Sequence, residues 1–191
     1  MSRPIHVIYI PGFGNKFDTF RSWILDRWKY KGITMQLVPM NWESGAFDAK
    51  LRSLNQAIDA AKGKRIVLIG ESAGGSMVVH SMAARPKDLF KVVTLCGKNS
   101  QPETVGQSYF DRSPAFKQSM QKLNQSIEQL SAKQCAEFVS IHPIYDPTVP
   151  VRETLLPGCR RVRLWVVGHQ FTILLALTLY SPIVIRTLRR T

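Results

Sequence analysis

The sequence predicts a single α/β domain built on a mostly parallel six-stranded sheet with helices on both faces. Three observations lead to this fold class. The chain has 191 residues, of which 45% are hydrophobic and 20% charged, which suits one packed domain over residues 1–191. Short β-branched runs alternate with segments of helical period, as they do in βαβ units. Glycine and proline punctuate these runs singly, which excludes a collagen-like or low-complexity chain.

Six strands are predicted from short apolar or β-branched runs. They are residues 5–10, 35–38, 65–69, 92–95, 137–141 and 162–167. If the second strand lies outside the first, strands one and three become neighbours and the order across the sheet is 2-1-3-4-5-6. The ligand crevice of such a sheet is expected where the loops after strands one and three meet.

The first predicted helix lies between the first two strands. Phe20, Ile24 and Trp28 recur at helical spacing, with Trp23 beside them, so we expect them to form one apolar face. Gly32 is expected to stop this helix ahead of the second strand.

Two more helices precede the fourth strand. The second has an apolar face made of Phe47, Leu51, Leu54 and Ile58. Gly63 is expected to end it. The third begins after Ser72 and is expected to stop near Arg85, because a proline at position 86 disfavours helix at the residue before it.

The connection over residues 97–134 is longer than a crossover needs. Its second half carries an apolar stripe at helical spacing, made of Phe116, Met120, Leu123, Ile127 and Leu130. Two interpretations stay open at this point. The segment is either a packed crossover helix or a small cap over a pocket.

The cysteines and the chain ends indicate the expected setting of the protein. Cys96, Cys135 and Cys159 are too few and too scattered for a disulfide framework, and none pairs with a histidine at zinc-ligand spacing. We therefore expect a reduced, cytoplasmic setting and no metal or organic cofactor. Residues 1–14 contain no signal-peptide pattern. Residues 164–185 are apolar but interrupted, which favours a buried strand and helix over a membrane span.

The chain is strongly basic, with a formal net charge of +13. Arginines cluster near the C-terminus, at positions 160, 161 and 163 and at positions 186, 189 and 190. These clusters are either an ordinary solvated surface or a patch for weak contact with an anionic membrane or another polyanion. No aromatic-interleaved basic motif of a nucleic-acid-binding module is present, so no specific nucleic-acid partner is expected.

The sharpest local signal is Gly70-Glu71-Ser72-Ala73-Gly74, which stands between an apolar strand and a helix. A strand that turns abruptly into a helix leaves one residue in a strained conformation with its hydroxyl exposed, and only small neighbours permit that turn. A plain helix N-cap serine needs no glycine on each side. The motif therefore favours an exposed nucleophile, Ser72, above the positive end of a helix dipole.

With this motif in place, the sequence resembles the α/β-hydrolase superfamily over nearly its whole length. It is similar to its compact serine esterases, such as the small bacterial lipases and the retinoblastoma-binding-protein-9-like serine hydrolases. The resemblance implies an acid after a later strand and a histidine after the last strand, because a serine needs a base and the base needs an orienting group.

The other positions that the family requires can be matched to this sequence. Asp146, a few residues past the fifth strand, resembles the family's acid, although an aspartate before proline is also a common turn residue. His169, directly after the sixth strand, resembles the base. His6 lies in a strand and His80 in a helix, so neither is expected at the carboxyl edge of the sheet, and His142 is interpreted as structural.

An oxyanion hole and an acyl pocket complete the expected site. The oxyanion hole is expected from the backbone N–H groups of Phe13, in the loop after the first strand, and of Ala73, directly after the nucleophile. Pro11 stands where the family commonly has histidine. Trp42, with Phe13, is expected either to line an apolar acyl pocket or to pack in the core.

Three functions remain open on this reading. The first is a serine hydrolase that cleaves carboxylic esters through Ser72, His169 and Asp146 by way of an acyl-enzyme. A thioesterase or an acyltransferase would use the same residues. The third is an inactive hydrolase-fold module that binds anionic partners through its basic C-terminal surface, because a fold does not establish an activity.

Overall fold

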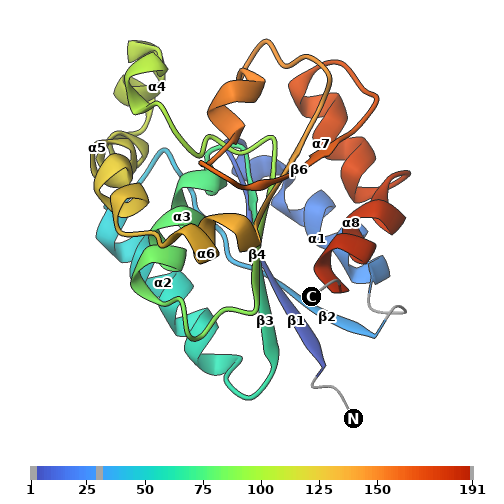
Figure 1. The fold of residues 1–191 in the computed structure, drawn as a ribbon. Coiled ribbons are helices and arrows are strands. Elements are labelled where there is room, and N and C mark those ends of the chain that lie inside the picture. The colour runs from blue at the N-terminus through green and yellow to red at the C-terminus, as the bar shows by residue number, and fades with distance from the viewer. Residues whose placement is uncertain (1–3, 29–31, 190–191) are drawn as a thin grey trace.

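A computed structural model describes residues 4–28 and 32–189, and in it six parallel strands form one sheet (Figure 1). The order is β2-β1-β3-β4-β5-β6, as the sequence predicted. The strands are β1 (Ile5–Ile10), β2 (Ile33–Leu37), β3 (Arg65–Glu71), β4 (Lys91–Leu95), β5 (Phe138–His142) and β6 (Arg160–Arg163). The three central strands β1, β3 and β4 are buried along almost their whole length, as expected where helices cover both faces.

Two strand predictions need correction. β2 begins at Ile33 because its ladder with β1 already starts at the pair Ile5 and Ile33. The sixth strand was predicted over residues 162–167, but β6 ends at Arg163. Its partner β5 is followed by Pro143, which has no N–H to continue a ladder. The chain beyond β6 therefore leaves the sheet, and Val167 pairs again only in an isolated bridge to Tyr145.

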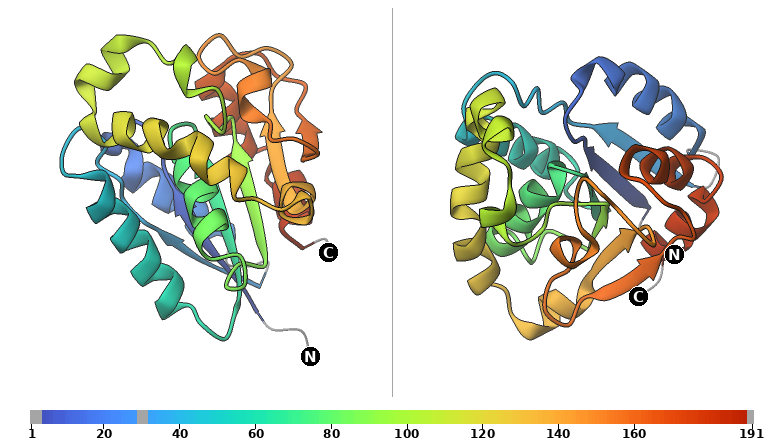
Figure 2. Two further views of the ribbon diagram at one scale, coloured as in Figure 1. Left: turned by 60° about the vertical axis from the view of Figure 1, so that its left-hand side comes forward. Right: turned by 90° about the horizontal axis from the view of Figure 1, so that it is seen from above.

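Helices cover both faces of the sheet (Figure 2). One layer contains α1 (Asp18–Asp26), α7 (His169–Leu177) and α8 (Ser181–Arg189), and the other contains α2 (Phe47–Ala60), α3 (Gly74–Ala84) and α5 (Pro114–Glu128). Alternate residues of each strand serve the two layers: on β1, Val7 and Tyr9 face the first and Ile8 and Ile10 the second. Short elements occupy the connections, namely α4 (Gln107–Arg112), α6 (Ala132–Glu137) and the 3₁₀ turns Asn15–Phe17, Pro102–Thr104 and Val151–Thr154.

The prediction for the first helix is only partly correct. α1 ends at Asp26 and not at Gly32, and residues 29–31 lie outside the described part of the chain. Ile24 and Trp28 are buried against the sheet, but Phe20 and Trp23 are 49% and 54% exposed. Ile24, Leu25 and Trp28 already fill the side that contacts the sheet, which leaves Phe20 and Trp23 on the flank that faces solvent.

The other helices follow their patterns closely. α3 ends at Ala84, as the proline at position 86 predicted, and Gly63 after α2 has a φ of +92°. In the segment 97–134, α5 buries Phe116, Met120 and Leu123 and packs against α3. The part of the segment that precedes α5, including α4, stands above the carboxyl ends of the strands (Figure 1).

Within the described residues, no single helix is both long and apolar enough to cross a membrane. The pair α7 and α8 has sufficient length and apolar character together, but the two helices meet at an angle of 69°. α7 is buried against the sheet on one side, so the buried helix predicted in this apolar stretch is confirmed, whereas β6 ends before the stretch begins.

A buried histidine joins α3 to α5. His80 Nδ1 lies 2.7 Å from the hydroxyl of Ser126, and Nε2 lies 3.1 Å from the carbonyl oxygen of Ser119. Burial lowers the pKa of His80 from 6.5 to about 4, against a smaller upward contribution from Ser119. His80 is therefore neutral and structural at neutral pH.

This histidine makes the stability of the fold depend on pH. Since its folded pKa lies below its unfolded value, His80 contributes stability above pH 6.5 that is lost as the pH falls from 6.5 towards 4. We expect this group to remove about 3 kcal/mol of unfolding free energy between neutral pH and pH 4. Urea unfolding at both pH values, for wild type and His80→Asn, measures the difference. An equal pH dependence in the two proteins would contradict this account.

Candidate active site

The turn between β3 and α3 places Ser72 at the carboxyl edge of the sheet. Ser72 has a φ of +50°, which is a costly conformation for a residue with a side chain. A Cβ on Gly70 would lie 2.6 Å from the Gly74 carbonyl oxygen, and a Cβ on Gly74 would lie 2.3 Å from the Ile10 carbonyl oxygen. The two glycines are therefore required by close backbone approach, which is the physical basis of the motif read from the sequence.

Ser72, His169 and Asp146 come together in one hydrogen-bonded chain. Ser72 Oγ lies 2.9 Å from His169 Nε2, and His169 Nδ1 lies 2.7 Å from Asp146 Oδ2. His169 is the first residue of α7 and Asp146 lies in the loop after β5, so the sheet brings together side chains 97 and 23 residues apart. Both His169 and Asp146 are buried. This arrangement can transfer the Ser72 proton to the imidazole and orient that imidazole.

The carboxylate of Asp146 is held in its charged form by several groups. Its Oδ1 accepts hydrogen bonds from the backbone N–H groups of Thr148 and Val149, each at 2.9 Å. Burial by itself would raise the pKa of Asp146, but the hydrogen bond and charge of His169, with these N–H groups, lower it below its ordinary value. Asp146 is thus an ionised acceptor for His169.

Cys96 is a neighbour of this chain that the sequence did not indicate. Its sulfur, an Asp146 oxygen and a His169 nitrogen lie within 4.8 Å of one another, which is compact enough for a metal ion. Burial, together with the charge of Asp146, raises the pKa of the Cys96 thiol well above its usual value. Because a metal ligand must be the thiolate, this set is better suited to a protonated thiol that donates to Asp146 than to a metal.

The loop after β1 packs directly on the nucleophile. A Cβ on Gly12 would lie 2.7 Å from Ser72 Cβ and 3.3 Å from Ser72 Oγ. Phe13 and Ala73, the predicted oxyanion residues, line one pocket together with Ser72. Trp42 is not on that pocket wall. It is buried behind it, where its indole N–H donates to the carbonyl of Pro11 at 3.0 Å and its ring packs near Phe13.

The close approach of this loop provides a test. In Gly12→Ala, the added methyl group would displace the Ser72 side chain or the loop, because real Cβ atoms do not approach to 2.7 Å. A misplacement of about 1 Å can reduce a rate on the order of 10²-fold, so we expect kcat to fall by that amount with folding intact. Ser53→Ala is the control away from the pocket and should keep the wild-type kcat, because Ser53 is an exposed residue of α2 whose hydroxyl donates to the Ala49 carbonyl. Similar kcat values for the two variants would contradict this expectation.

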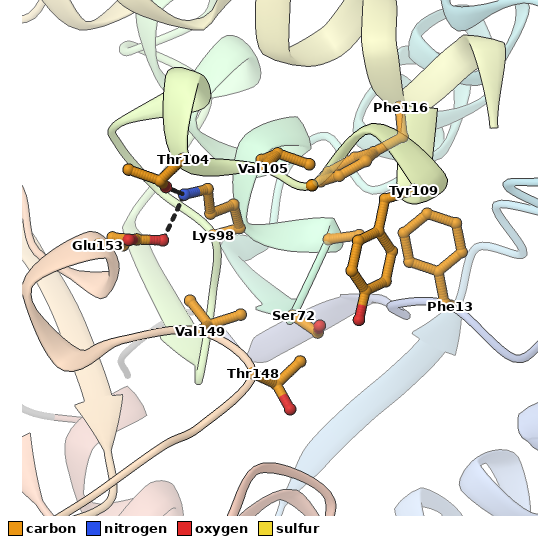
Figure 3. Close-up of a pocket in the computed structure, with 12 residues that line it drawn as sticks. Phe13, Ser72, Lys98, Thr104, Val105, Tyr109, Phe116, Thr148, Val149 and Glu153 are labelled. Carbon is orange, nitrogen blue, oxygen red and sulfur yellow. Dashed lines mark hydrogen bonds and ion pairs between the residues drawn. The ribbon is translucent and has the colours of Figure 1, made fainter. Parts of the chain in front are cut away.

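A pocket beside Ser72 is formed by the loops that follow β1 and β5, by the segment before α5 and by the first turn of α5 (Figure 3). The hollow measures about 440 Å³ when the open solvent at its mouth is included, and Ser72 lies on its wall. Its walls are largely apolar, with Phe13, Val105, Tyr109, Phe116 and Val149. Phe13 was predicted as a possible pocket residue, whereas Tyr109 and Phe116 were not, because only the fold brings α4 and α5 over the nucleophile.

One wall of the pocket carries a buried ion pair. Lys98 Nζ contacts the carboxylate of Glu153 and donates to the hydroxyl of Thr104 (Figure 3). It also donates to the carbonyl of Gln101. Burial lowers the pKa of Lys98, and Glu153 opposes that effect. Three acceptors use all three N–H donors of the ammonium group. The pair therefore fixes the pocket wall and leaves Lys98 without a free donor for a ligand.

A second buried ion pair lies behind the nucleophile, and sequence analysis missed it. Glu71, next to Ser72, accepts hydrogen bonds from Arg21 Nε at 2.8 Å and from the hydroxyl of Tyr9. Arg21 also donates to the carbonyl of Gly14 at 2.9 Å. The available signal was a glutamate between an apolar strand and the motif serine, since a buried carboxylate needs a partner.

The remaining predicted groups lie elsewhere. His142 Nδ1 is 2.9 Å from the carbonyl oxygen of Pro143, and His6 Nδ1 is 2.7 Å from the hydroxyl of Thr34. The first arginine cluster lies on the edge strand β6. The second lies on α8, except for Arg190, which is outside the described residues.

Comparison with solved structures identifies the architecture. A pyrethroid hydrolase from Sphingobium faniae superposes with a TM-score of 0.70 at 11% identity, over 96% of this chain and 97% of that chain. The chain has the α/β-hydrolase fold. The metagenome-derived lipolytic enzymes LipS and LipT give 0.67 at 13% identity over 98% and 93%. A Paleococcus ferrophilus monoacylglycerol lipase gives 0.64 at 10% identity over 98% and 96%.

The likeness to these α/β-hydrolases is one of structure. No protein-family model matches the sequence, and no curated protein matches it significantly. Identities of 10–13% at almost full coverage mean that the fold is shared while most side chains differ. Function must therefore be argued from the site that the fold carries.

Proposed function

We propose that this α/β-hydrolase-fold protein cleaves carboxylic esters, with Ser72 as nucleophile, His169 as general base and acid, and Asp146 as the group that orients His169. The observation that carries the proposal is the continuous hydrogen-bonded chain from Ser72 Oγ through His169 to Asp146, with links of 2.9 and 2.7 Å. Its position beside an apolar pocket at the carboxyl edge of the sheet supports it.

In the first half of the reaction, Ser72 Oγ attacks the ester carbonyl while His169 Nε2 takes the hydroxyl proton. Asp146, which keeps its charge, stabilises the imidazolium that forms. The backbone N–H groups of Phe13 and Ala73 receive the developing oxyanion in this proposal. His169 then gives its proton to the leaving alcohol, and Ser72 carries the acyl group.

In the second half, His169 takes a proton from water, and the resulting hydroxide attacks the acyl group on Ser72. The proton returns to Ser72 Oγ as the acid leaves. The apolar wall around Phe13, Val105 and Tyr109 suits the hydrocarbon part of an acyl group. A thioester would be cleaved by the same steps, so the class of the leaving group is left to experiment.

Labelling with a fluorescent fluorophosphonate tests the proposal, because this reagent traps only an activated serine. We expect the wild type to be labelled and both Ser72→Ala and His169→Ala to remain unlabelled, with thermal unfolding curves like that of the wild type. Ser53→Ala on α2 is the matched control and should be labelled normally, since Ser53 is an exposed serine whose hydroxyl only donates to the Ala49 carbonyl.

The contrary results are equally clear. A folded wild-type protein that takes no label, or a His169→Ala variant labelled as fast as wild type, would overturn the proposed roles. If the wild type is labelled, its hydrolysis rates for p-nitrophenyl butyrate and butyryl-thiocholine then distinguish an ester hydrolase from a thioesterase.

A further inference from the structure

Large apolar side chains lie exposed on the layer formed by α1 and α7. Between 38% and 70% of each side chain is accessible to solvent. We call this set the outer apolar face, and its members are Phe17, Phe20, Trp23, Phe171, Leu174 and Leu179. Scattered apolar residues are normal on a protein surface, whereas a contiguous set marks a surface that another molecule covers.

The outer apolar face is contiguous. α1 and α7 lie side by side in one layer (Figures 1 and 2), and two hollows run along their junction. Phe17, Phe20 and Leu174 line the first hollow. Trp23 and Thr178, the latter next to Leu179, line the second. Phe171 is one helical turn from Leu174, so it extends the same stripe of α7.

Basic side chains accompany the aromatic rings of this face. The guanidinium of Arg27 lies 3.3 Å from the ring centroid of Trp23, and the ammonium of Lys16 lies 5.1 Å from that of Phe17. On α8, Arg186 and the apolar Ile183 are both exposed and three residues apart, so they share a side of that helix. α1 has two acidic residues: Asp18 is paired with Arg21, and Asp26 lines the second hollow together with Arg27.

We propose that the outer apolar face is a docking surface for an anionic lipid bilayer. This inference goes beyond the proposed ester hydrolysis and does not rest on it. Tryptophan, phenylalanine and leucine would enter the boundary between head groups and acyl chains, while Arg27 and Lys16 would contact phosphates. The bilayer supplies both the apolar interior and the negative charge that this face complements.

Charge and composition select this occupant over two others. A second copy of the chain would bring a net charge of +13 against +13, so electrostatics oppose self-association through this face. A nucleic acid would complement the charge, but it offers no apolar interior for Leu174 and Leu179. On α7, Phe171 and Leu174 lie on the side that faces away from the core, where an interfacial helix places its apolar residues against lipid.

Vesicle sedimentation tests the inference. Wild-type protein is mixed with vesicles of phosphatidylcholine alone, or of phosphatidylcholine and phosphatidylglycerol, at low and high salt. We expect binding to the anionic vesicles, weakened by salt. The double variant Trp23→Ser/Leu179→Ser should bind on the order of tenfold more weakly, because it loses two apolar anchors. Arg27→Gln should bind about fivefold more weakly, in line with one basic contact to an anionic surface.

The matched control is Arg52→Gln on α2, which removes the same charge from the opposite layer. It should bind like wild type, and thermal unfolding of all variants should coincide with that of wild type. Equal losses in Arg27→Gln and Arg52→Gln would overturn the inference in favour of a diffuse attraction. Three other results would also overturn the inference. The first is binding of the double variant to anionic vesicles at the wild-type level. The second is an oligonucleotide that displaces the wild type, but not the double variant, from vesicles. The third is a wild-type dimer in light scattering that the double variant does not form.

Discussion

Replacing Asp146 by asparagine is expected to lower kcat for p-nitrophenyl butyrate by about 10⁴-fold while the protein stays folded. The reason lies in the two faces of the carboxylate. Its Oδ1 accepts the N–H groups of Thr148 and Val149 and must remain an oxygen. The amide NH₂ of the asparagine would then take the other position and point at His169 Nδ1, which is now 2.7 Å from Oδ2.

That reversal changes the tautomer of the base. A donor facing Nδ1 makes Nδ1 an acceptor and moves the ring proton to Nε2. An Nε2 that carries the proton donates to Ser72 Oγ and cannot accept its proton, so the general base is lost although every atom is nearly in place.

The control is the same aspartate-to-asparagine substitution at a site far from Ser72. Asp59→Asn makes the same chemical change at a half-exposed site on α2 and should leave kcat unchanged. An Asp146→Asn variant that keeps more than about a tenth of the wild-type kcat would refute the assigned role, since such a loss is far below that of an orienting acid.

Removing the charge of Arg21 is expected to cause the largest loss of stability. Arg21 and Glu71 are buried, with side-chain exposures of 7% and 1%, and they share a bidentate contact. Burial alone would lower the pKa of Arg21, but the hydrogen bonds and charge of Glu71 raise it, so the guanidinium stays charged. In Arg21→Met the carboxylate of Glu71 loses its compensating charge, which typically costs about 3–5 kcal/mol.

Thermal and urea unfolding measure this effect. A loss of that size lowers the melting temperature by about 10 °C in a domain of this length. The exposed pair Arg112 and Glu43 is the control, because both side chains are near half exposed and Arg112→Met should cost less than about 1 kcal/mol. The double variant Arg21→Met/Glu71→Leu should recover part of the stability, because it removes the uncompensated charge as well. Equal destabilisation by Arg21→Met and Arg112→Met would contradict the expected role of burial.

The same ion pair has a consequence for the site. Arg21 connects the residue beside the nucleophile to the carbonyl of Gly14, in the loop that carries Phe13. Tyr9, whose pKa burial and Glu71 raise well above its ordinary value, remains a donor to Glu71. Loss of this connection should therefore affect the position of the loop relative to Ser72 as well as the stability of the fold.

The sheet, its strand order and the three residues that meet at its edge could be predicted from the sequence. Alternation of apolar runs with helical periods is a local signal, and it carries the strand order because parallel crossovers are short and right-handed. The glycines at positions 70 and 74 are likewise readable, because a sharp turn from strand to helix needs small residues. Asp146 and His169 were predicted from the resemblance to the α/β-hydrolase superfamily, which implies an acid and a histidine after later strands.

Other features could not be predicted, because they depend on contacts between segments distant in sequence. The spacing of apolar residues in the first helix could not distinguish Phe20 and Trp23, which face solvent, from Trp28, which faces the sheet. The helix has apolar residues on more than one side, and spacing alone does not say which side is buried. Trp42 follows β2 and Tyr109 lies on the short helix α4, and packing alone puts the first behind the pocket and the second on its wall. Side-chain type sets what a residue can do, and the fold sets what it touches.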